Sequence, residues 1–109
     1  MNDLRHFQLG LIGWPLGHSF SPALHAAALA SCDFIGEYRL LPVPLLPEGR
    51  TRLTTILQQV RNGALHGINV TIPHKQNVVP LLDELTPAAL EIGAVNTIFL
   101  QNGKLVGDN

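Results

Sequence analysis

The stretch that decides the fold lies at residues 67–75 and reads Gly67-Ile68-Asn69-Val70-Thr71-Ile72-Pro73-His74-Lys75. Apolar and polar side chains alternate from Ile68 to Ile72, which is the period of two expected of a β-strand. Pro73 lacks a backbone N–H, so it ends the hydrogen-bonded ladder. Lys75 therefore follows the carboxyl end of a strand, where open α/β sheets place their ligand crevice.

Lys75 is isolated in charge as well as in position. Histidines aside, it is the only residue from Gly63 to Leu82 that is charged at neutral pH. Such a lysine either extends its ammonium group to water or is held in a pocket for use. The spacing alone favours the first interpretation, so the choice depends on the other segments.

Strand-like and helix-like segments alternate along the chain. Strands are expected at residues 7–12, 37–43, 67–72 and 94–100, and helices at about 22–32, between 49 and 62, and at 87–92. This order predicts an α/β fold, a three-layer sandwich whose mostly parallel sheet has helices on both faces. Asn102-Gly103 is the strongest hairpin signal, so residues 104–106 should add an antiparallel hairpin strand.

Local signals support the helices. Ser21-Pro22 and Thr86-Pro87 each place a hydroxyl at the N-cap and a proline at the first helical position. Asn62-Gly63 is a typical helix end. The middle helix has an apolar face at i, i+3, i+4 and i+7, formed by Leu53, Ile56, Leu57 and Val60.

Composition excludes several classes of function. Hydrophobic residues make up 46% of the 109 residues and charged residues only 14%, which is typical of one folded domain and not of a disordered tail. The formal net charge of −1 and the lack of a basic run argue against nucleic-acid or membrane partners. We find neither a signal peptide nor a membrane-spanning run, so a cytoplasmic protein is expected.

Metal and dinucleotide sites are also disfavoured. The five histidines show no i, i+4 pair and no neighbouring cluster of Cys or carboxylates, so no metal is expected. Gly10, Gly13 and Gly17 have the spacing G-x-x-G-x-x-x-G, which differs from the dinucleotide fingerprint G-x-G-x-x-G. Pro15 also removes an amide that a phosphate would need.

Two hydroxyls and several amides are candidate ligand groups. Ser19 and Ser21 precede a predicted helix, whose N-terminal amides and dipole favour a carboxylate. The alternative is that Ser21 only caps this helix and Ser19 faces solvent. Asn96 is unexpected inside an apolar strand unless its amide has partners, although a neighbouring backbone group would suffice. With Asn69, Thr71 and Lys75, these groups suit a small polyhydroxylated acid.

Four motifs now resemble the N-terminal, substrate-binding domain of the shikimate dehydrogenase family. They follow the family's order over essentially the whole chain: Gly13-x-Pro15-x-x-His18-Ser19-x-Ser21-Pro22-x-x-His25, Asn69-Val70-Thr71-x-Pro73-x-Lys75, Gly93-Ala94-Val95-Asn96-Thr97 and Gly107-Asp108-Asn109. The resemblance implies NADP-dependent reduction of 3-dehydroshikimate to shikimate in chorismate and aromatic amino-acid biosynthesis.

The resemblance also implies roles for individual residues. Lys75 corresponds to the catalytic lysine. Ser19 and Ser21 correspond to the hydroxyls that hold the substrate carboxylate, while Asn69, Thr71 and Asn96 line the same pocket. In the family, the last motif continues into a catalytic aspartate and an NADP-binding Rossmann domain. Residues 1–109 are therefore expected to be a fragment or isolated domain, inactive alone, with NADP bound by a C-terminal domain that it lacks.

Two alternatives stay open. One is a quinate/shikimate dehydrogenase with looser substrate choice, although Ser19 and Thr71 fit the shikimate-specific pattern better. The other is a stand-alone binding module for a shikimate-like acid. The sequence does not fix the oligomeric state, and a homodimer is among the arrangements left open.

Overall fold

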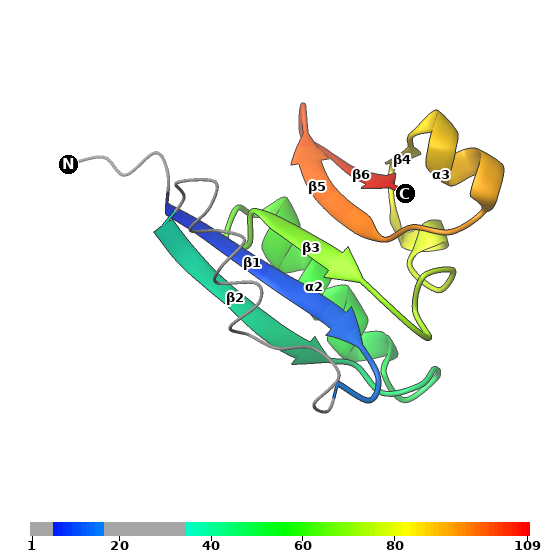
Figure 1. The fold of residues 1–109 in the computed structure, drawn as a ribbon, viewed down its shortest axis with the longest axis horizontal. Coiled ribbons are helices and arrows are strands. Elements are labelled where there is room, and N and C mark those ends of the chain that lie inside the picture. The colour runs from blue at the N-terminus through cyan, green and yellow to red at the C-terminus, as the bar shows by residue number, and fades with distance from the viewer. Residues whose placement is uncertain (1–5, 17–34) are drawn as a thin grey trace.

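The computed structural model describes residues 6–16 and 35–109 (Figure 1). Its strands are β1 (His6–Gly13), β2 (Ile35–Pro42), β3 (Gly67–Val70), β4 (Glu84–Leu85), β5 (Thr97–Gln101) and β6 (Lys104–Asp108). Its helices are α2 (Arg50–Arg61), the short 3-10 helix η1 (Val79–Leu81) and α3 (Pro87–Ile92). The helix expected at 22–32 lies outside the described residues.

The strands form one six-stranded sheet in the order β2-β1-β3-β5-β6-β4. β1 runs parallel to both β2 and β3, and β4 runs parallel to β6. β5 is antiparallel to β3 and to β6, so within this sheet it is the strand that runs against the others. The predicted α/β class, with a mostly parallel sheet and an antiparallel hairpin, is confirmed.

The position of the reversed strand differs from expectation. The hairpin strand at residues 104–106 was expected to oppose the sheet, but β5, the strand before the turn, does so. After β3 the chain forms β4 at the far edge of the sheet, and α3 then leads into β5. A helix of six residues spans only about 9 Å, which is too short to return the chain to the other end of the sheet. β5 therefore starts near the end where β4 finishes.

α2 covers one face of the sheet (Figure 1). Its predicted apolar face is confirmed, because Leu53, Ile56, Leu57 and Val60 are all buried. They pack in one cluster with sheet residues that include Ile12, Ile68, Val70, Ile98 and Leu105.

The predicted Thr86-Pro87 cap and the Asn102-Gly103 turn are also confirmed, whereas the Ser21-Pro22 cap lies outside the described residues. The Thr86 hydroxyl accepts a hydrogen bond from the Ala89 N–H at the start of α3, and Gly93 ends the helix with a φ of 77°. Asn102 and Gly103 have φ values of 53° and 78°, as a tight hairpin turn between β5 and β6 requires.

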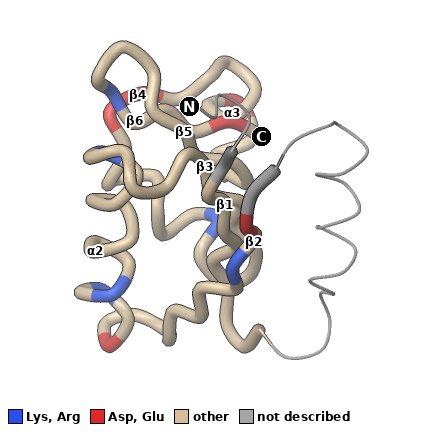
Figure 2. Tube along the Cα trace, turned by 90° about the vertical axis from the view of Figure 1, so that its left-hand side faces the viewer, with Lys and Arg blue, Asp and Glu red and all other residues tan. Residues whose placement is uncertain are grey.

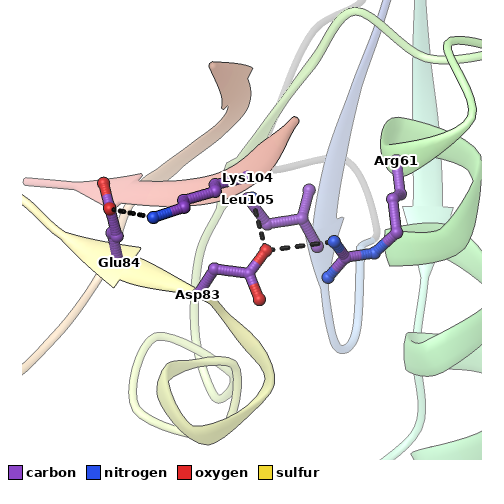
Figure 3. Close-up of polar contacts among 5 residues, drawn as sticks. All are labelled: Arg61, Asp83, Glu84, Lys104 and Leu105. Carbon is purple, nitrogen blue, oxygen red and sulfur yellow. Dashed lines mark hydrogen bonds and ion pairs between the residues drawn. The ribbon is translucent and has the colours of Figure 1, made fainter. Parts of the chain in front are cut away.

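One carboxylate ties three elements together near β4 (Figure 3). Asp83 Oδ2 accepts from the Leu105 backbone N–H at 2.8 Å and from Arg61 of α2 at 3.0 Å. Lys104 and Glu84 form a second ion pair at 3.1 Å beside it. The Leu105 N–H, and then Arg61, hold the pKa of the Asp83 carboxyl below its usual range.

Charged residues do not form a basic patch in the described part of the chain. Figure 2 shows Lys and Arg spread over α2, β2, β6 and the loops. Among the helices at residues 35–109, none is long and apolar enough to cross a bilayer.

Candidate functional site

The candidate site lies on the face of the sheet opposite α2. Ile68 and Val70 belong to the core under α2, so Asn69, between them in β3, points to the other face. Strand register places Asn69 beside Leu11 of β1 and Thr97 of β5. This face carries a cavity of about 350 Å³, which is lined by Leu11, Tyr38, Asn69, Val70, Thr71, Asn96 and Thr97.

Thr71 lines the cavity just beyond the end of β3. The expected strand reached Ile72, but β3 stops at Val70, and Ile72 is 71% exposed. The Thr71 N–H still bonds to Ile12 O at 2.8 Å. A Cβ at Gly13 would lie 2.5 Å from Thr71 Cγ2, so the close approach of β1 to Thr71 requires a glycine.

Lys75 lies beside this cavity and not in its lining. It is half-buried and lines an open hollow of about 260 Å³ with Ile72, Pro73, Gln76 and Ala94. Its backbone carbonyl accepts from the Val95 N–H at 2.8 Å. The lysine is thus fixed against the segment that carries Asn96.

The residue before the lysine is fully buried. His74 is 0% exposed, and its Nε2 lies 2.6 Å from the carbonyl oxygen of Val43. Its Nδ1 lies 3.1 Å from the Asn77 amide nitrogen, which also donates to Pro73 O at 3.2 Å. Because an amide NH2 group only donates, Nδ1 accepts and Nε2–H donates to Val43. His74 therefore ties the Lys75 loop to the segment after β2.

Hydroxyl groups hold both asparagine amides in the cavity. The Tyr38 hydroxyl donates to Asn69 Oδ1 at 2.9 Å, and the Thr97 hydroxyl donates to Asn96 Oδ1 at 3.1 Å. Burial raises the pKa of Tyr38 to about 12, so this phenol stays protonated and can donate at any physiological pH. The Asn69 amide nitrogen donates to Asn96 O and to Thr97 Oγ1, both at 3.4 Å.

The sequence-predicted residues thus divide into three groups. Asn69, Thr71 and Asn96 surround one cavity, whereas Lys75 lines the neighbouring hollow. Ser19 and Ser21 lie outside the described residues. Among the described residues, the Asn96 side chain bonds to the side chains of Thr97 and Asn109, and not to a backbone group as the alternative expected.

Three polar residues of this region were missed by sequence reasoning. Tyr38 and Thr97 line the cavity and His74 supports the lysine loop. Tyr38 is the only tyrosine in the chain and lies in a predicted strand, which hints at a special position but names no partner. His74 directly precedes Lys75, and this position next to a candidate site residue is the sequence signal that could have identified it.

The described residues offer no metal centre. At residues 6–16 and 35–109, no three His, Cys, Asp or Glu side chains group so that they could hold an ion.

Comparison with known protein families shows which family the chain belongs to. The family described as "Shikimate dehydrogenase substrate binding domain" matches residues 11–98. The chain belongs to this family. The match covers both asparagines, the threonine and the lysine of the candidate site.

Individual members of the shikimate dehydrogenase family agree with this assignment. The NADP(+) shikimate dehydrogenase of Desulforamulus reducens is 49% identical over 100 residues, covering 92% of this chain and 33% of that protein. The shikimate 5-dehydrogenase of Thermus thermophilus, solved in complex with NADP(H) and shikimate, is 39% identical with a TM-score of 0.79. That comparison covers 94% of this chain and 37% of the Thermus chain.

The same fold also occurs in a reductase for another substrate. The 5-ketofructose reductase of a Gluconobacter species is 25% identical with a TM-score of 0.80, covering 97% of this chain and 36% of that chain. The chain spans about a third of the length of the curated shikimate dehydrogenases that it matches.

Proposed function

We propose that the protein containing this chain is a shikimate dehydrogenase, which reduces 3-dehydroshikimate to shikimate with NADPH in aromatic amino-acid biosynthesis. Residues 1–109 form its substrate-binding domain, and a C-terminal domain holds the NADP. The observation that carries this proposal is the gathering of Asn69, Thr71 and Asn96 around one cavity, next to the hollow that Lys75 lines. A cytoplasmic location belongs to the proposal.

The cavity suits a substrate with several hydroxyl groups. Its polar side chains are amides and hydroxyls, which exchange hydrogen bonds with alcohol groups without a net charge. Asn69, Thr71 and Asn96 are proposed to contact these hydroxyls. Ser19 and Ser21 are proposed to hold the carboxylate, as the sequence of their loop suggests.

Lys75 is the proposed catalytic residue. NADPH, when bound, supplies the hydride that reduces the ketone. As the ketone oxygen gains negative charge, the Lys75 ammonium stabilises it by a hydrogen bond and donates the proton that completes the alcohol. Such a proton donor typically contributes about 10²- to 10⁴-fold in rate.

A substrate panel tests the proposal. The complete protein is assayed with NADP⁺ and shikimate or quinate, and with NADPH and 5-ketofructose. We expect turnover of shikimate and little of quinate or 5-ketofructose. Turnover of quinate at a comparable rate would favour a quinate/shikimate dehydrogenase, and binding of shikimate without turnover would favour a binding module. Sedimentation equilibrium of the same protein would detect a homodimer.

A further inference from the structure

A series of side-chain hydrogen bonds runs across the cavity wall from β2 to the end of β6. It leads from the Tyr38 hydroxyl through the Asn69 amide, the Thr97 hydroxyl, the Asn96 amide and the Asn109 amide to the carbonyl oxygen of Ala94. Each group donates to the next group in the series. Five side chains from β2, β3, β5 and the segments beside β5 and β6 are thereby linked.

The direction of this series follows from its last member. The Ala94 carbonyl can only accept, so the Asn109 NH2 group must face it, at 3.1 Å. Asn109 Oδ1 is then left to accept from the Asn96 NH2 group. Asn96 Oδ1 in turn accepts from the Thr97 hydroxyl.

The orientation of Asn69 has an independent constraint. Its NH2 group lies 3.4 Å from the backbone carbonyl of Asn96, which again can only accept. Asn69 Oδ1 therefore faces Tyr38, whose protonated hydroxyl donates to it. Turning either amide over would place its oxygen against an acceptor, the Asn96 carbonyl for Asn69 and Asn109 Oδ1 for Asn96.

The lengths of these bonds differ in a consistent way. The hydroxyls bind the amide oxygens of Asn69 and Asn96 at 2.9 and 3.1 Å. The NH2 groups of the same amides make contacts of 3.4–3.5 Å, beyond the usual range for N–H···O bonds. The amide oxygens are thus firmly engaged, whereas the weak contacts of the amide N–H groups can be exchanged for a better-placed ligand acceptor at little cost.

We propose that Tyr38 and Thr97 are positioning residues that make the cavity wall a hydrogen-bond donor surface. By holding the two amide oxygens, they direct the NH2 groups of Asn69 and Asn96 to oxygen atoms of a bound ligand. The ligand class is a molecule with neighbouring hydroxyl oxygens that accept from both amides. The inference rests on the proposed function for the identity of this ligand.

Kinetics of conservative variants test the inference in the complete protein. Tyr38→Phe and Thr97→Val each remove one hydroxyl and keep the shape of the side chain. We expect each to raise the KM for shikimate by about 5- to 20-fold, since a substrate hydrogen bond is weakened, with kcat within about twofold. Thr97→Ser restores the hydroxyl and should restore the KM, whereas Thr55→Val, an exposed hydroxyl on α2, should change neither constant.

A double-mutant cycle separates positioning from direct contact. If Tyr38 acts through Asn69, Tyr38→Phe should change the KM little in an Asn69→Ala background. Additive effects, or an unchanged KM in both Tyr38→Phe and Thr97→Val, would overturn the inference.

A second readout does not depend on activity. The side-chain NH2 resonances of Asn69 and Asn96 are followed by ¹⁵N NMR in the ligand-free protein. Tyr38→Phe should shift the Asn69 pair, and Thr97→Val should shift both pairs. If the resonances do not move, the hydrogen-bond series is wrong. If they move but the unaltered protein does not turn over shikimate, the series stands and the proposed function fails.

Discussion

Replacement of His74 by phenylalanine should lower the free energy of unfolding substantially. Phenylalanine fills similar space but cannot bond to the Val43 carbonyl, which now accepts from Nε2 at 2.6 Å in a fully buried position. An unpartnered buried carbonyl costs about 1–3 kcal/mol. The Asn77 amide also loses its 3.1 Å contact but keeps Pro73 O, which adds about 1 kcal/mol or less. The expected loss is about 1–4 kcal/mol.

Urea unfolding followed by circular dichroism measures this loss. With a typical slope of about 2 kcal/mol per molar urea, the midpoint should fall by roughly 0.5–2 M. His66→Phe is the matched control, because His66 is exposed and water can replace its contact with the Gln8 N–H. This control should lose less than about 1 kcal/mol. If His74→Phe shifted the midpoint no more than His66→Phe does, the buried hydrogen bonds would not hold the Lys75 loop.

Two further predictions concern the packing and pH dependence of the sheet. Gly13→Ala should destabilise the protein by about 1–3 kcal/mol, because the new Cβ would lie 2.5 Å from Thr71 Cγ2. Gly67→Ala is the control and should cost less, because its Cβ would meet no atom closer than 3.5 Å. Urea unfolding midpoints of the two variants measure the difference. Because the folded-state pKa of Asp83 is lowered, its contribution to stability is complete above about pH 4 and is lost as pH falls through the folded-state pKa. Urea midpoints measured from about pH 6 to about pH 2.5 should therefore fall less steeply for Asp83→Asn than for the unaltered protein, and equal slopes would contradict this reasoning.

Elements defined by local chemistry were predictable from the sequence. The buried face of α2, the Thr86-Pro87 helix start and the Asn102-Gly103 turn each depend on residues close in sequence, and the structure has all three. The reversal of β5 was not predictable in this way. It depends on the two-residue strand β4, which brings the chain to the carboxyl end of the sheet just before the short helix α3, and no local pattern indicates β4.

The candidate site shows the same division. Asn69, Thr71 and Asn96 were identifiable because polar residues in apolar strands need partners, and the fold does bring them to one cavity. Tyr38 and Thr97 were not, because tyrosine and threonine are ordinary strand residues whose role here depends on hydrogen bonds to partners on neighbouring strands. The binding and catalytic roles assigned to Asn69, Thr71 and Asn96, and to Ser19, Ser21 and Lys75, remain predictions.

The most direct test of the central claim is steady-state turnover of shikimate by the complete protein with Lys75→Ala, together with a shikimate binding titration. We expect kcat to fall by about 10²- to 10⁴-fold while the Kd for shikimate changes only modestly, because the ammonium acts mainly as the charge on the oxygen develops. Lys104→Ala, which removes an exposed lysine of β6, should leave both constants unchanged. An unchanged kcat in Lys75→Ala would contradict the account.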